Sequence, residues 1–241
     1  MEYLSASRIE THDQCGLNFY FKYKDKTDDF DKTVDFHADF GSLMHEIMEK
    51  LAKRQIDVFQ AKIQFQQRYP FCYVPEQYYE EWFRLGLAGI EQKAVELAYL
   101  NILGVEQEFK FSLQFGIPDL YGFVDLIYRD SKGLVIRDYK KSKPFTTTER
   151  AKKIQPYVYA LAAYQLYGEI PYKFEFDFLL YGETAEYVID DVFMELAKIK
   201  VVAGWNRIRR SQFEANHQPF FCESFCSYRS ICPVYLKKNK N

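Results

Sequence analysis

Apolar residues recur at helical spacing through most of the first hundred residues. Over residues 40–54 and again over 76–103 they fall mainly three or four positions apart, which predicts two amphipathic helices. A shorter helix is predicted before them, capped by Ser5 or Ser7 and running toward Cys15. The first part of the chain is therefore expected to be helical.

The next part of the chain has the hydrophobic pattern of β-strands. Apolar and polar side chains alternate over 105–113, whereas 120–128 and 134–139 are apolar nearly throughout. Such runs predict strands, and the two apolar ones suit strands covered on both faces. The turn from Asp130 to Gly133 is of the kind that joins antiparallel neighbours.

Helical and strand patterns alternate in the last third of the chain. A helix is predicted over 155–167, with a proline near its start and Gly168 as its stop. A strand is predicted over 173–181 and a helix over 188–210. This order predicts a single α/β domain over 1–241, with a small mixed β-sheet flanked by helices.

Composition narrows the class of protein further. The 241 residues are 48% hydrophobic and 27% charged, which is typical of a globular chain. Thirty-two basic and 34 acidic residues give a net charge of −2, so a nucleic-acid partner would have to meet a local basic patch. The sequence shows neither a secretory signal nor an apolar run long enough to span a membrane, which predicts a cytoplasmic protein without a membrane partner.

Two aspartates are predicted to face each other in the sheet. If the turn is symmetric, Arg129 lies opposite Leu134, and the same register places Asp125 opposite Asp138. Opposed side chains have Cβ atoms about 4.5–5.5 Å apart, so two carboxylates there destabilise the sheet unless a cation lies between them. Lys140 follows Asp138 by two residues and falls on the same face.

These three residues predict a site for metal-assisted phosphodiester cleavage. The alternative is that Asp138 and Lys140 belong to a solvated face, but their apolar neighbours indicate central strands, where a buried charge needs a partner or a metal. Two carboxylates with a backbone carbonyl suit Mg²⁺ or Mn²⁺. Such an ion polarises a phosphoryl oxygen, while Lys140 would orient water or stabilise the developing charge.

Four short motifs resemble those of a known family. Their order and spread, from about residue 3 to residue 233, are similar to the RecB-like branch of the PD-(D/E)XK nucleases. Each motif alone is weak, but the four together are specific. They are G-x-x-x-H at 41–45, G-x-x-D at 122–125, D-x-K at 138–140 and Q-x-x-x-Y at 155–159.

The resemblance implies a restriction-endonuclease-like core with a defined site. His45, Asp125 and Asp138 would ligate the metal, and Lys140 would be catalytic together with the two aspartates. A structural histidine buried among apolar neighbours is the alternative for His45. Glu108 is a further acidic candidate on the preceding strand, where it could also be an ordinary exposed residue.

The same resemblance implies contacts with DNA. Gln155 and Tyr159 would touch DNA beside the site, and they share one face near a helix N-terminus that favours phosphate; core packing is the alternative for Tyr159. Three aromatic residues could stack on unpaired bases: Tyr20, Phe21 and Tyr23. Six basic residues within fourteen positions could bind phosphates, although such runs are also common on solvated faces: Lys140, Lys141, Lys143, Arg150, Lys152 and Lys153.

Four of the five cysteines predict an iron–sulfur cluster. Cys222, Cys226 and Cys232 lie within eleven residues, and Cys15 precedes the core, a pattern similar to AddB-type and CRISPR-adaptation nucleases. The resemblance implies a structural [4Fe–4S] cluster that joins the two ends of the chain. The first spacing is C-x-x-x-C, where that family usually has C-x-x-C. Zinc or simply buried thiols are alternatives, and Cys72 is expected to be packed.

The sequence thus predicts a metal-dependent DNA nuclease, an exonuclease in preference to an endonuclease. Recombination, repair, phage DNA metabolism and CRISPR adaptation are the processes implied by the resemblance, with DNA as substrate and a helicase or other recombination or adaptation protein as partner. The alternatives are a non-catalytic DNA-binding or scaffolding member of the fold and an iron–sulfur redox protein. The intact acidic set disfavours both.

Overall fold

The core of the protein is a five-stranded mixed β-sheet. The computed structural model describes residues 2–28, 31 and 36–238. The strands lie in the order β1-β2-β3-β4-β5; β3 and β4 are parallel and the other neighbours antiparallel. Their bounds are β1 Asn101–Phe111, β2 Leu120–Asp130, β3 Gly133–Lys140, β4 Lys173–Phe178 and β5 Glu183–Val188.

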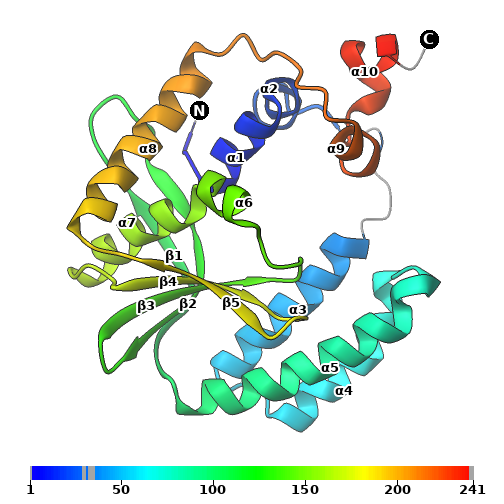
Figure 1. Cartoon of the computed structure of the whole chain (residues 1–241), viewed down its shortest axis with the longest axis vertical. Coiled ribbons are helices and arrows are strands. Elements are labelled where there is room, and N and C mark those ends of the chain that lie inside the picture. Colours follow the sequence, from blue (N-terminus) through cyan, green and yellow to red (C-terminus); the bar gives the residue numbers. More distant parts are fainter. Residues whose placement is uncertain (1, 29–30, 32–35, 239–241) are drawn as a thin grey trace.

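Helices cover both faces of the sheet (Figure 1). One face packs on α1 (Ala6–Gln14), α7 (Gln155–Tyr167) and α8 (Asp191–Arg210), and the other on α3 (Phe36–Ala52), α4 (Val58–Arg68) and α5 (Glu76–Tyr99). Each face has its own apolar cluster. This layered arrangement is the predicted α/β class.

Short elements complete the chain. They are α2 (Gly16–Phe19), the π-helix η1 (Tyr20–Asp25), the 3₁₀ helices η2 (Tyr69–Cys72) and η3 (Arg229–Ile231), α6 (Thr147–Lys152), α9 (Pro219–Ser224) and α10 (Pro233–Lys238). α9 lies near α2 (Figure 1), and residues from 15–21 and 215–234 line one cavity. No helix among the described residues is long and apolar enough to cross a membrane.

Local sequence signals explain several boundaries. The Ser5 hydroxyl accepts a hydrogen bond from the Arg8 amide and caps α1. Gly168 ends α7 in the left-handed conformation, at φ 72°. Between β2 and β3, Arg129 lies opposite Leu134, so the predicted register is confirmed.

Several predicted boundaries are wrong. The predicted helix over 76–103 ends at Tyr99, and residues 101–103 belong to β1. The predicted strand over 173–181 ends at Phe178, and an unpredicted strand, β5, precedes α8, which begins at Asp191 and not at residue 188. The reason is that β5 is an edge strand in which only Ala185 is buried, so its sequence lacks a clear apolar alternation.

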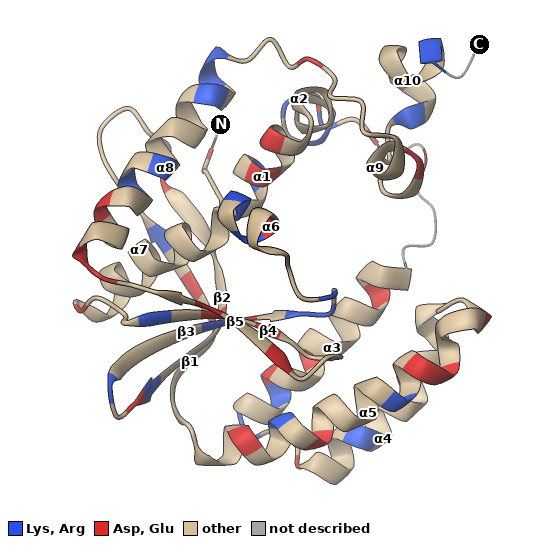
Figure 2. Cartoon of the chain, viewed as in Figure 1, with Lys and Arg blue, Asp and Glu red and all other residues tan. Residues whose placement is uncertain are grey.

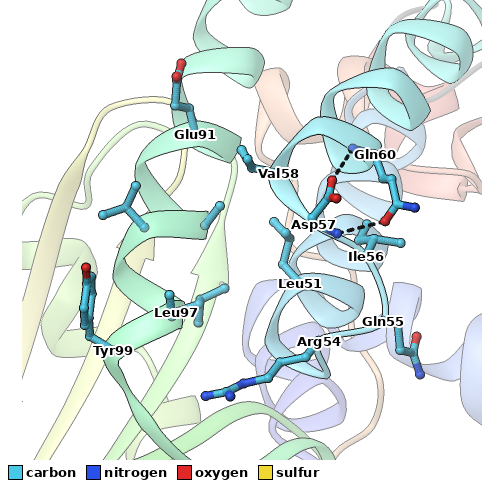
Figure 3. Close-up of a pocket in the computed structure, with 13 residues that line it drawn as sticks. Leu51, Arg54, Gln55, Ile56, Asp57, Val58, Gln60, Glu91, Leu97 and Tyr99 are labelled. Atoms are coloured by element: carbon cyan, nitrogen blue, oxygen red, sulfur yellow. Dashed lines mark hydrogen bonds between the residues drawn. The ribbon is translucent and has the colours of Figure 1, made fainter.

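A hollow of about 690 Å³ opens between the end of α3 and the helices α4 and α5 (Figure 3). Apolar side chains such as Leu51, Ile56 and Leu97 line it, and reciprocal hydrogen bonds between Asp57 and Gln60 fix the start of α4 at its edge. No residue of the predicted site lines this hollow. The candidate chemistry lies elsewhere, on the sheet.

Candidate active site

Three side chains from three elements converge on one point. His45 of α3, Glu106 of β1 and Asp125 of β2 each offer one ligand atom, and these atoms lie within 4.8 Å of one another. All three side chains are partly buried. The group contains two of the three predicted metal ligands and one residue, Glu106, that was not predicted.

The backbone of β3 holds this group in place. The Tyr139 amide donates a hydrogen bond of 2.8 Å to Oδ2 of Asp125. Nε2 of His45 lies 3.0 Å from the Tyr139 carbonyl oxygen, and Nδ1 of His45 lies 3.4 Å from Oδ2 of Asp125. The imidazole therefore bridges α3 to the middle of β2 and the end of β3.

Burial decides the protonation states in the group. It lowers the pKa of His45, which favours the neutral imidazole that can ligate a metal. Burial and the nearby Asp138 carboxylate raise the pKa of Asp125 well above its usual range. Burial and the nearby Glu49 also raise the pKa of Glu106. The nearby ammonium groups of Lys140 and Lys53 do not offset these shifts, and a bound cation would add the positive charge that does.

Asp138 lies beside the three-residue group, paired with Lys140. Nζ of Lys140 is 2.5 Å from Oδ2 of Asp138 and donates a hydrogen bond of 3.0 Å to Oε1 of Gln155. Burial lowers the pKa of Lys140, but the charge and hydrogen bond of Asp138 outweigh it, so the pKa is raised. Lys140 is therefore an ammonium ion next to the group.

Gln155 contacts both members of this ion pair. Its side-chain amide donates hydrogen bonds to Oδ1 of Asp138 and to the Tyr159 hydroxyl, the latter at 3.0 Å. Tyr159 is buried, and its ring packs at 5.9 Å from that of Phe109. The start of α7 thus positions Asp138 and Lys140, a relationship that sequence reasoning missed because it assigned Gln155 to DNA.

The β1–β2 register explains why the acidic residue is Glu106 and not Glu108, because Glu108 lies opposite Phe123 and Glu106 therefore falls opposite Asp125. The β1–β2 register shifts between Ile102 and Gly104, and Glu106 has a φ of 48°, which interrupts the simple alternation assumed for β1. Glu108 is exposed and bonds to Tyr121. The glycine at 104 was the available signal, since isolated glycines in strands often mark bulges.

Two motif glycines provide space for neighbouring side chains. A Cβ on Gly41 would lie 2.9 Å from Cδ of Lys141, and a Cβ on Gly122 would lie 2.9 Å from the ring of Phe109. Both approaches are closer than ordinary contacts. Each glycine therefore allows close packing around the site.

The other predicted DNA contacts have varied surroundings. Lys and Arg residues gather on α6 and on the segment that joins it to β3, and Lys143 is exposed there (Figure 2). Arg150 donates to the Glu186 carbonyl, and Lys153 lies 3.8 Å from Glu10. The three aromatic residues proposed to stack on bases also contact other rings: Tyr20 contacts Phe213, Phe21 contacts Tyr228 and Tyr23 contacts Phe19.

The four candidate cluster cysteines line one small cavity between the two ends of the chain. Cys15, Cys222, Cys226 and Cys232 all contribute to it, whereas Cys72 lies apart in η2. The Asn216 amide donates to Cys15 Sγ at 3.4 Å and the Asn18 side chain to Cys226 Sγ at 3.6 Å. Burial raises the pKa of Cys226. Within the described part of the chain, no three cysteine sulfurs all lie within 4.8 Å of one another.

The mixed sheet flanked by helices, with acidic groups on neighbouring strands and a lysine beside them, defines a restriction-endonuclease-like α/β domain. The chain belongs to the PD-(D/E)XK nuclease superfamily, whose family model matches residues 3–233.

Solved structures are similar to the chain in fold. A crystal structure from Eubacterium rectale, of a protein provisionally named an exonuclease, has 14% sequence identity and a TM-score of 0.52, and the match covers 98% of this chain and 88% of that one. A protein named SSO0001 has 15% identity and a TM-score of 0.43, over 78% of this chain and 95% of that one, too distant to support an argument. No curated protein matches.

Proposed function

We propose that the protein is a metal-dependent DNA nuclease that hydrolyses phosphodiester bonds. The observation that carries this proposal is the convergence of His45, Glu106 and Asp125 beside the Asp138–Lys140 ion pair. Carboxylate oxygens with one imidazole and the adjacent Tyr139 carbonyl suit Mg²⁺ or Mn²⁺. The raised pKa values of Asp125 and Glu106 support this fit, because the carboxylates need a positive partner.

Each residue of the site has a chemical role in this proposal. His45, Glu106 and Asp125 would hold the divalent cation, and Asp138 would join them through an oxygen that now contacts Lys140 or Gln155. The cation polarises a phosphoryl oxygen when bound. The Lys140 ammonium orients the attacking water and stabilises the charge that develops on phosphate. Gln155 keeps Lys140 in position.

We further propose an exonuclease mode, which the name of the Eubacterium rectale protein supports. DNA is the substrate, and Lys141 and Lys143 would bind its phosphates. Recombination, repair, phage DNA metabolism and CRISPR adaptation remain the proposed settings, with a helicase or adaptation protein as partner.

The cysteine cavity supports a second proposal, a structural [4Fe–4S] cluster. The four thiolates come from both ends of the chain, so a shared cluster would join Cys15 to the segment 222–232. Tetrahedral zinc, with Zn–S of about 2.3 Å, is the alternative group for the same four thiolates.

Iron and sulfide analysis tests the cluster directly. Anaerobically purified protein should contain both elements and absorb visible light. Cys226→Ser should remove the colour and lower the melting temperature, while Cys72→Ser, a cysteine outside the cavity, should keep both. Stoichiometric zinc without iron would contradict the proposal.

End-labelled linear DNA and a closed circle test the nuclease. With Mn²⁺ or Mg²⁺, the wild-type protein should shorten the linear DNA and leave the circle intact, and Asp138→Asn should abolish cleavage. Nicking of the circle would indicate an endonuclease. DNA binding without cleavage under either metal would favour the non-catalytic alternative.

A further inference from the structure

A cavity of about 490 Å³ adjoins the proposed catalytic lysine. Lys140, Gln155 and Tyr159 line one part of it, so it is continuous with the candidate active site. Tyr3, Tyr121 and Phe123 line another part. We call this cavity, defined by these six residues, the stacking pocket. Its volume falls within the range of about 300–1,000 Å³ that is usual for pockets holding small molecules.

The aromatic wall of the stacking pocket is a series of contacting rings. The Tyr3 and Tyr121 centroids are 4.9 Å apart, and those of Tyr121 and Phe123 are 5.7 Å apart, both edge-to-face. Phe123 is at the outer end of this series and is 43% exposed. A large apolar ring held in place by its neighbours, yet open to solvent, is suited to stack on a flat ligand.

Gly122 lies in the lining of the stacking pocket, against the ring of Phe109. The Phe109 ring approaches this glycine so closely that a Cβ would lie 2.9 Å away. Phe109 and Gly122 both line the pocket. A side chain at position 122 would therefore displace the Phe109 ring from the wall of the pocket.

We propose that the stacking pocket receives an unpaired base of the DNA strand that is cut, at the nucleotide next to the scissile phosphate. This inference rests on the proposed nuclease function, since Lys140 then marks the position of the phosphate. A base within a duplex is stacked and paired, so it reaches such a pocket only from a single strand or after leaving the helix. The aromatic wall therefore selects a strand that is unpaired at the cutting site.

Binding to two single-stranded probes tests the stacking pocket. The probes are an oligothymidylate and the same oligonucleotide with abasic sites throughout, each fluorescently labelled and bound in EDTA so that no cleavage occurs. Phe123→Ala should weaken thymidylate binding about tenfold, because one stacked base contributes about 1–3 kcal/mol. Abasic binding should change little, and Phe123→Trp should keep the wild-type affinity.

A matched control is Phe115→Ala, which truncates a fully exposed phenylalanine that does not line the pocket. It should change neither affinity. The proposal is overturned if Phe123→Ala weakens both probes equally or neither. If Phe123→Ala gives either of these results and the wild-type protein still cleaves DNA, the stacking proposal is wrong and the nuclease proposal stands. If binding depends on the bases but the wild-type protein does not cleave DNA in Mn²⁺ or Mg²⁺, the nuclease proposal is wrong and the pocket still binds a base.

Discussion

The Lys140 ammonium lies 2.5 Å from a carboxylate oxygen of Asp138, two residues away on β3. The other oxygen of Asp138 accepts a hydrogen bond from Gln155. Asp138 is almost completely buried, and both of its oxygens have partners before any cation arrives. Ligation of a metal by Asp138 must therefore share or replace one of these contacts.

Removing the Lys140 charge should lower both the cleavage rate and the free energy of unfolding. Lys140→Met should lower the cleavage rate at least about 100-fold, because the developing charge on phosphate loses its stabilising cation. It should also lower the free energy of unfolding by about 3 kcal/mol, since Asp138 keeps only its hydrogen bond from Gln155. Initial cleavage rates and urea denaturation measure the two effects.

The double variant Lys140→Met with Asp138→Asn provides the control. It removes the uncompensated charge and should recover most of the stability while the protein stays inactive. A wild-type cleavage rate in Lys140→Met would remove Lys140 from the catalytic set.

The register of β1 against β2 predicts a difference between two glutamates. Glu106→Gln should weaken Mn²⁺ binding at least about tenfold and abolish cleavage, because a charged oxygen ligand becomes a neutral amide. Glu108→Gln makes the same chemical change two residues away, at an exposed position, and should leave both properties near wild type. Calorimetric titration with Mn²⁺ measures the affinity. Equal weakening in both variants would contradict the assignment.

The two glutamates show which parts of the site could be predicted from the sequence and which could not. The β2–β3 register followed from the local turn at Asp130–Gly133, so the approach of Asp125 to Asp138 could be predicted. Glu106 could not be assigned, because the segment 112–119 between β1 and β2 does not fix their register, which also shifts at a bulge where β1 packs in the finished domain. There, a Cβ on Gly104 would lie 2.9 Å from the Tyr167 hydroxyl.

Contacts between residues distant in sequence were also predictable in some cases and not in others. The resemblance to a known family grouped the four cysteines although they are distant in sequence, and in the structure they line one cavity. The contacts of Gln155 with Asp138 and Lys140 depend on where the start of α7 meets β3. No periodicity or spacing in the chain encodes that approach. The same holds for the wall of Tyr3, Tyr121 and Phe123.

A buried ion network fastens α5 to the sheet and predicts a large stability effect. Nζ of Lys93 lies 2.5 Å from Oδ2 of the fully buried Asp177, and Arg137 lies 3.4 Å from the same oxygen. Burial raises the pKa of Asp177, and the two cations oppose this effect. Lys93→Met should therefore lower the free energy of unfolding by about 3–5 kcal/mol.

Two further variants isolate the charge effect at Lys93. Adding Asp177→Asn to Lys93→Met should recover much of the loss in urea denaturation. Lys198→Met breaks an exposed pair with Glu195, of 2.6 Å, and should cost less than about 1 kcal/mol. Equal losses in Lys93→Met and Lys198→Met would show that the buried network contributes little.

His12 predicts a loss of stability in mild acid. Its ring packs edge-to-face against Phe19 and Phe213, at 5.5 and 6.4 Å. Burial lowers its pKa below the usual 6.5; Asp13 opposes this shift and Arg207 adds to it. Between the folded pKa and 6.5 the unfolded chain binds more protons, so stability should fall as the pH drops through 6.5, and the loss is complete below the folded pKa.

Melting curves of the wild type and His12→Gln measure this dependence. The difference in stability between the two should shrink between about pH 7.5 and pH 5, by roughly 1 kcal/mol for each unit of pKa shift. Carboxylates elsewhere titrate equally in both proteins and cancel in the comparison. Because α1 leads directly to Cys15, the acid effect should be accompanied by loosening of the cysteine cavity. A constant difference across this pH range would show that His12 titrates alike in the folded and unfolded chains.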